Sequence, residues 1–282
     1  MGVLTRNDIG RAAQAACVLE AVSAKPGNVN RLFDFADTTL GDFLLSAVMI
    51  GQCMEEADRY PLGQTVLSGV QATRRVVGRN TNLGMILLFA PLAKAYGQGD
   101  LRTAVRQVLE SSTVEDALLV SQAIRLAGPG GLGTAPEHDV VGDPRIPLLE
   151  LMSLAGERDS VAKEYATGFA ITFELAYPTL DGYLKQESDF CRAVVQTYLS
   201  VLAEVPDTLI ARKKGLQEAK AVSRKAAGVS RAGETERREF DQYLRSEGNS
   251  LNPGTTADLV AAAIFTYFLE RGLESCRNRV IA

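Results

Sequence analysis

The sequence predicts an all-α protein, a single compact multi-helix domain of about ten or more helices over residues 1–282. Apolar residues recur at steps of three and four along most of the chain, which is the spacing of an amphipathic helix. We find no convincing run of alternating polar and apolar residues, the period of a strand. No Ser/Gly-rich linker separates two apolar regions, so one hydrophobic core is the simplest arrangement.

The helices follow from this pattern in order. After Asp37, a natural N-cap residue, one apolar stripe runs from Leu40 to Met54. The same period predicts helices over residues 7–24, 62–77, 83–96, 101–109, 114–127, 147–155, 160–177, 189–205, 208–227, 234–246 and 256–276. The predicted N-caps of three later helices are Ser188, Asp207 and Thr255. Residues 213–231 are rich in Lys, Arg and Ala, and we expect an exposed helix or a mobile loop there.

Composition excludes several classes of protein. A hydrophobic fraction of 46% with 23% charged residues is typical of soluble globular proteins. The net charge of −4 leaves no basic stripe for a nucleic acid. The longest apolar stretch, residues 83–93, contains Pro91 and is too short to cross a bilayer, so we expect a buried helix. Residues 1–11 show no secretory signal, and the four cysteines have no zinc-type spacing. We expect a cytoplasmic protein with no membrane or nucleic-acid partner, and a homo-oligomer is possible.

Three polar, turn-forming stretches stand out against the helices: KPGNVNR at 25–31, NTNLG at 80–84 and NPGTTAD at 252–258. Two of them open a helix, where free backbone N–H groups and the positive end of the helix dipole favour a phosphate. Alternatively, Thr255 or Thr256 is only an N-cap and Asp258 its capping-box partner. The residues alone leave both interpretations open.

Two other motifs are weaker. The string GPGGLG at 128–133 fits G-x-G-x-x-G, but no strand is predicted before it, so we expect a glycine C-cap leading into a loop. No P-loop string occurs. His138 is the single histidine, and we expect it in a surface loop.

Carboxylates are more promising than histidine for chemistry, although most should be caps or solvated charges. Glu174 lies between apolar neighbours, which predicts either a functional carboxylate or a buried ion pair. Arg212 begins a basic run, RKK, that could clamp phosphates or form a solvated helical face.

The four stretches KPGNVNR, NTNLG, VPDTLIARKKG at 205–215 and NPGTTADL, in this order, resemble the triphosphoribosyl-dephospho-CoA synthase family. The resemblance spans nearly the whole chain. It implies an all-α enzyme that uses ATP and Mg²⁺, joins the triphosphoribosyl part of ATP to the ribose 2′-hydroxyl of dephospho-CoA, and releases adenine. The partners it implies are a nucleotide and a coenzyme-like acceptor.

The resemblance and the local chemistry together select the candidate site. We predict catalytic roles for Asp42, Asp207 and Glu174, and metal binding by Asp258 and Asp116. The predicted cofactor-binding residues are Lys25, Gly27, Asn28, Asn30, Arg31, Asn80, Thr81, Asn82, Gly84, Arg212, Pro253, Gly254, Thr255 and Thr256.

The sequence also departs from the family pattern. Asn30 stands in place of an acid, Asn82 and Leu83 replace a His-Lys pair, and the histidine expected after the first loop is absent. These departures are similar to a divergent branch found in archaea and in bacteria with methanopterin-type carriers.

Three functions follow as hypotheses. The first is displacement at the anomeric carbon of ATP ribose, with a carboxylate as base. The second is a nucleotide-dependent transfer to a methanopterin- or methanofuran-type precursor. The third is a non-catalytic cofactor-binding protein.

Overall fold

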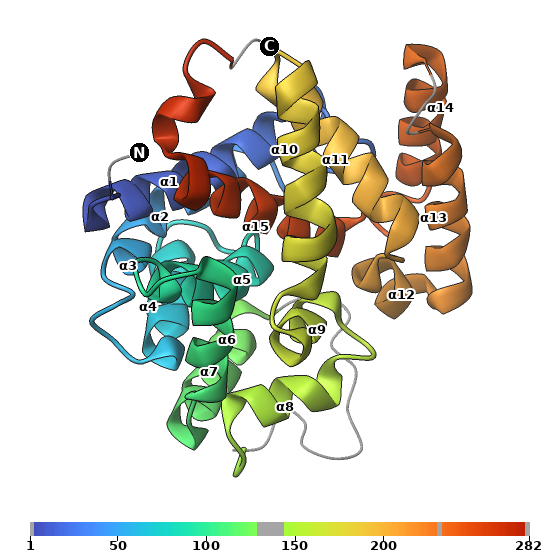
Figure 1. The fold of residues 1–282 in the computed structure, drawn as a ribbon. Helices are drawn as coiled ribbons and strands as arrows, with labels where there is room; N and C mark the ends of the chain where they lie inside the picture. Colours follow the sequence, from blue (N-terminus) through green and yellow to red (C-terminus); the bar gives the residue numbers. More distant parts are fainter. Residues whose placement is uncertain (1–2, 129–143, 230–232, 280–282) are drawn as a thin grey trace.

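The computed structural model describes residues 3–128, 144–229 and 233–279, and within these ranges it contains helices and no sheet. The all-α prediction is confirmed (Figure 1). The helices are α1 (Arg6–Val22), α2 (Leu40–Met49), α3 (Gly51–Glu55), α4 (Leu62–Arg74), α5 (Leu83–Ala95), α6 (Leu101–Glu110), α7 (Val114–Ala127), α8 (Leu148–Ala155), α9 (Ser160–Thr167), the π-helix η1 (Ile171–Ala176), α10 (Tyr177–Gln186), α11 (Phe190–Glu204), α12 (Thr208–Lys214), α13 (Leu216–Val229), α14 (Glu234–Arg245), α15 (Gly254–Arg271) and the 3₁₀ helix η2 (Leu273–Cys276).

Helix α15 lies at the centre of the fold. Its residues 259–269 are all buried, and a helix that is apolar on every side needs neighbours on every side. The helices α1, α5, α10 and α11 supply them (Figure 1). The Phe265 ring, for example, lies 4.6 Å from the ring of Phe89 on α5, measured between centroids. This packing places the N-terminal end of α15 inside the molecule.

Helix α5 is also buried, as predicted, in spite of Pro91 in its last half. Proline has no backbone N–H, so the carbonyl of Leu87 loses its donor from the following turn. The hydroxyl of Tyr165 on α9 donates to this carbonyl at 2.7 Å instead. The acceptor that the proline leaves open is therefore used for a hydrogen bond that joins α9 to α5. Among the described helices, none is long and apolar enough to span a bilayer.

Several predicted helix boundaries are wrong. The helices begin at local N-caps and end at residues with a left-handed backbone conformation, although the apolar spacing continues past these points. Thr39, not Asp37, caps the second helix. The predicted helix over 160–177 ends at Gly168 and Phe169, which both have positive φ, and α10 after it was not predicted. Gly215, with φ of +93°, divides the predicted helix over 208–227.

The other cap and loop predictions have mixed outcomes. Asp207 caps α12 as predicted, whereas Asp189 rather than Ser188 caps α11, and Thr255 lies within α15. Gly128 is the expected left-handed C-cap of α7, while His138 lies outside the described residues. The basic 213–231 segment is mainly α13, a helix that buries four of its residues in the fold.

The break after α9 is held by a buried carboxylate. Glu164 accepts hydrogen bonds from the backbone N–H groups of Ile171 and Thr172, at 2.8 and 2.6 Å, and from the Thr172 hydroxyl at 2.5 Å. Burial outweighs these bonds and raises the pKa of Glu164 from 4.5 to about 7.

This pKa predicts a pH-dependent stability. Between pH 4.5 and about 7 the folded protein keeps the Glu164 proton that the unfolded chain releases, so the free energy of unfolding should fall as pH rises, by up to about 3 kcal/mol. Glu164→Gln should remove this part of the dependence. Urea unfolding across that pH range measures it, and Glu174→Gln, at an exposed ion pair, is the matched control. An unchanged slope in Glu164→Gln would contradict the assignment.

Candidate functional site

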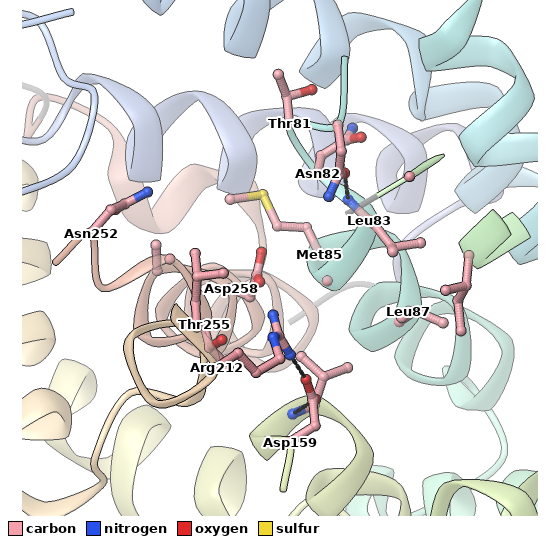
Figure 2. Close-up of a pocket in the computed structure, with 18 of the residues that line it drawn as sticks. Thr81, Asn82, Leu83, Met85, Leu87, Asp159, Arg212, Asn252, Thr255 and Asp258 are labelled. Carbon is pink, nitrogen blue, oxygen red and sulfur yellow. Dashed lines mark hydrogen bonds and ion pairs between the residues drawn. The ribbon is translucent and has the colours of Figure 1, made fainter. Parts of the chain in front are cut away.

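A pocket of about 790 Å³ opens where the N-terminal ends of α5, α9 and α15 meet α12. This volume lies within the range of small-molecule binding pockets and is large enough for a nucleotide. Unpaired N–H groups and helix dipoles make such ends attractive to anions. Figure 2 shows Thr81, Asn82, Asp159, Arg212, Thr255 and Asp258 around this space.

The lining has polar and apolar parts. Cationic side chains come from four residues: Arg79, Arg158, Arg212 and Lys213. The amide side chains are those of Asn28, Asn80, Asn82, Asn249 and Asn252. The apolar part comes from α5, α7, α8 and α9, with Leu87, Ile124, Leu151, Met152, Ala155 and Val161 among its residues. A ligand with a charged part and a flat or apolar part suits this arrangement.

Asp258 is the carboxylate that stands free in the pocket. Figure 2 shows it between Thr255, Met85 and Arg212. Among the described residues it has no hydrogen-bond or ion-pair partner. Gly84, which also lines the pocket, lies next to this carboxylate. A Cβ atom at position 84 would lie 2.1 Å from the Asp258 Oδ2 atom. Only glycine at position 84 leaves the carboxylate in place.

Burial raises the pKa of Asp258 well above its ordinary value. The negative charges of Glu20, Asp207 and Asp159 raise this pKa further, while Arg212 lowers it. An added cation would relieve this repulsion. Asp258 is not the capping-box partner that the sequence left open, because another residue caps α15.

That residue is Asp207. Its Oδ1 atom accepts hydrogen bonds from the N–H groups of Leu209 and Ile210, at 2.9 and 3.0 Å. Its Oδ2 atom accepts from the N–H and hydroxyl of Thr256, at 2.7 and 2.8 Å. Asp207 is buried and does not line the pocket, so its four bonds make it the link between the first turns of α12 and α15. The same contacts withdraw Thr256 from any ligand.

Lys25 is also internal. Its ammonium is fully buried and donates to the backbone oxygens of Glu20 and Ser23 and to the Glu20 carboxylate, the last at 3.0 Å. These contacts use its three donors, so it does not reach into the pocket. Glu20, which no sequence motif marks, lines the pocket instead.

The first polar loop contributes Asn28 and Val29 to the pocket lining, and Asn28 is the polar side chain of the two. The amide of Asn28 donates to the Asn252 Oδ1 atom at 2.7 Å and joins the first and last stretches. The Asn30 amide holds the loop itself, bonding to the oxygens of Lys25 and Asn28. Arg31 is exposed and lies outside the lining.

Gly27, in the first polar loop, and Pro253, at the start of α15, lie close to each other outside the pocket lining. Gly27 has φ of +76°, and a Cβ there would lie 2.7 Å from Leu244 and 3.1 Å from Pro253. Neither residue lines the pocket.

The three basic residues of RKK on α12 have different partners, and two of them line the pocket. Arg212 forms an ion pair with Asp159, whose other oxygen caps α9. Lys213 donates to the backbone oxygen of Asn249 at 2.9 Å, and both cations line the pocket. Lys214 pairs with Glu247 and does not line it.

Two further predicted carboxylates, Asp42 and Asp116, lie outside the pocket. Asp42 forms a capping box with Thr39. Asp116 forms one with Thr113 and also accepts the N–H of Gly63 at 2.7 Å. These bonds use the carboxylates for helix caps.

Glu174 corrects a prediction. It forms an ion pair with Arg102, as one alternative expected, but its side chain is 59% exposed, so the pair is not buried. The π-helix turns Ile171, Thr172 and Ala176 inward and leaves Glu174 on the surface. In the described ranges no group of three or more His, Cys, Asp or Glu side chains is arranged to hold a metal.

The polar stretches that the sequence selected thus meet in one pocket. The predicted residues that line it are Asn28, Asn80, Thr81, Asn82, Gly84, Arg212, Gly254, Thr255 and Asp258. Charged lining residues that were not selected are Glu20, Asp37, Arg79, Arg158, Asp159 and Lys213. Asp159 precedes a helical stripe and Arg79 precedes NTNLG, so position next to a motif was the signal that could have identified them.

Fold and pocket define a helical protein with a pocket whose lining suits an anionic, partly apolar small molecule. The family model of ATP:dephospho-CoA triphosphoribosyl transferase (CitG) matches residues 6–277, and the chain belongs to this family. It is a transferase of the triphosphoribosyl-dephospho-CoA synthase type, as the four ordered motifs predicted.

A crystal structure gives a second comparison. It shows a protein from Archaeoglobus fulgidus proposed to be a triphosphoribosyl-dephospho-CoA synthase, with 31% identity and a TM-score of 0.66. The match covers 81% of this chain and 99% of that one. No curated protein matches the chain.

The contacts of Asp207 predict a structural role for its charge. Asp207→Asn should lower the free energy of unfolding by roughly 2–4 kcal/mol, because the amide presents hydrogens to buried N–H and O–H donors. Asp42→Asn, at an exposed capping box, should cost about 1 kcal/mol or less. Chemical denaturation of both variants measures the difference. Equal, small losses would show that the Asp207 network contributes little.

Proposed function

We propose that the pocket binds ATP and transfers its triphosphoribosyl group to a hydroxyl of a coenzyme-like acceptor. The observation that carries this proposal is that three sequence stretches line one pocket. They are NTNLG at 80–84, the basic residues Arg212 and Lys213, and NPGTTAD at 252–258. Arg212, Lys213 and Arg79 can neutralise a triphosphate, and the N-terminal ends of α5 and α15 add N–H donors. The apolar wall between α7, α8 and α9 suits the base.

The transfer forms a bond from the acceptor oxygen to the anomeric carbon of the ATP ribose and breaks the bond from that carbon to adenine. The acceptor gives up a proton, and adenine takes one up as it leaves. The ribose passes through an oxocarbenium-like state, which nearby carboxylates stabilise. Glu20 is suited to take the acceptor proton, because it lines the pocket and burial raises its pKa, an effect that Lys25 opposes by favouring the charged form.

Mg²⁺ fits the pocket at Asp258. The residue offers an oxygen ligand that has no partner in the described part of the chain, and Mg²⁺ is commonly held by one or two carboxylates together with substrate phosphates and water. When bound, the ion neutralises triphosphate charge and orients the chain of phosphates. Asp116, the other predicted ligand, is used in its helix cap.

A metal role for Asp258 predicts a specific loss. Asp258→Asn should weaken the affinity for ATP in the presence of Mg²⁺ by about tenfold or more and change it little without Mg²⁺. Asp116→Asn should leave both affinities unchanged. Calorimetric titrations of the two variants and the unaltered protein measure this. The same Mg²⁺-dependent gain in Asp258→Asn as in the unaltered protein would exclude the metal role.

One observation favours an acceptor other than dephospho-CoA. Asn82 and Leu83 both line the pocket where the family carries a His-Lys pair, so a cation is missing from that wall. A pterin or furan precursor of a one-carbon carrier is the second candidate. We place the reaction in the cytoplasm, where ATP and coenzyme precursors occur.

Product analysis tests the proposed reaction. Incubation with ATP, Mg²⁺ and either dephospho-CoA or a pterin acceptor should release adenine, separable by chromatography. Arg212→Ala should reduce this release by at least about tenfold, because an interaction with the triphosphate is lost. Release of ADP or pyrophosphate without adenine would support phosphoryl or nucleotidyl transfer instead. Binding without turnover would indicate the non-catalytic alternative.

A further inference from the structure

Helix α14 packs over the loop that follows α1 and holds it through two side chains. Asp241 accepts the backbone N–H of Gly27 at 2.7 Å. Arg245 donates from Nε to both Asp241 oxygens at 2.9 Å and from Nη2 to the backbone oxygen of Asn28 at 2.6 Å. Neither α14 residue lines the pocket.

The Arg245 guanidinium also contacts two aromatic rings. Its central carbon lies 4.8 Å from the centroid of the Phe33 ring and 5.7 Å from that of Phe35. Such cation–π contacts are favourable at these distances. One side chain thus joins a helix, a loop carbonyl and two rings. Arginine suits the role because its planar group can donate along its edges while its faces meet rings.

The loop held in this way forms one wall of the pocket. Its lining residues are Asn28, Val29, Phe35, Asp37 and Thr38. Residues 31–38 contain no buried side chain, and Phe33 is 50% exposed. The hydrophobic effect therefore holds this stretch weakly, and a segment with few buried apolar contacts opens readily.

We propose that Arg245 is a positioning residue that fixes residues 31–38 as a wall of the pocket and so sets nucleotide affinity without touching the ligand. The proposal rests on the proposed function, because the ligand is ATP. Lysine in its place could pair with Asp241, but a single ammonium would not keep the Asn28 carbonyl and both rings together. The geometry of the guanidinium, beyond its charge, is what the segment requires.

Helix α14 offers a matched control. Arg238 and Glu234 form an ion pair with the same i, i+4 spacing as Arg245 and Asp241, but both side chains are exposed, and no hydrogen bond or ion pair joins them to the loop among the described residues. Arg238→Ala therefore removes an equivalent charge from the same helix without affecting residues 31–38.

The experiment compares Arg245→Ala, Arg245→Lys and Arg238→Ala in the full chain. Amide hydrogen exchange without ligand should become at least about tenfold faster within residues 31–38 in both Arg245 variants and stay unchanged in α5 and α15. The KM for ATP should rise about tenfold while kcat changes less than about threefold. Arg238→Ala should match the unaltered protein in each measurement.

Four results would overturn the proposal. Exchange in residues 31–38 that is equal in Arg245→Ala and Arg238→Ala would show that Arg245 does not hold the segment. Faster exchange throughout the protein would assign it to general stability. Faster local exchange with unchanged KM would separate the residue from nucleotide binding. Full rescue by lysine would show that the charge alone, and not the geometry of the guanidinium, holds the segment. If the unaltered protein does not turn over ATP, the proposed function and this nucleotide role fail together, whereas the exchange data still decide whether Arg245 holds the segment.

Discussion

The carboxylate of Asp207 is the interaction on which the pocket depends. It caps α12 with one oxygen and α15 with the other, so it sets the positions of two helices that are distant in sequence. Arg212 lies one turn into the first helix and Asp258 one turn into the second. A single buried group therefore brings a cation and a free carboxylate to the same space. Asp207 builds the site without lining it.

Most of the fold could be predicted because helix formation is largely local. Apolar spacing located nearly every helix, and the buried character of α5 followed from its composition. The breaks could not be located in the same way. Phe169 adopts positive φ because Glu164, buried by contacts distant in sequence, fixes the turn. The apolar period continues through this turn, so periodicity alone predicts one uninterrupted helix.

The candidate site was predictable where chemistry lies in a turn before a helix. Asn80, Thr81 and Thr255 reach the pocket because their stretches open α5 and α15. A carboxylate gives no comparable signal, since a ligand and a capping residue look alike in sequence. Asp42 and Asp116 follow a threonine by three residues, a pattern that also marks a capping box. Glu20 had no motif around it, and only the fold brings it into the lining.

Pro91 and Tyr165 have a consequence for how this protein can vary. The proline leaves the Leu87 carbonyl without a helical donor, and the tyrosine hydroxyl takes the vacant acceptor. Restoring an N–H at position 91 would give that oxygen a second donor, which its two lone pairs can accept, whereas losing the hydroxyl while the proline stays would strand the carbonyl. The tyrosine is thus expected to be replaced only together with the proline across descendants of this chain. Such paired replacement would keep α9 in its position against α5 as the sequence diverges. It would also keep Asp159, the N-cap of α9, in the pocket lining.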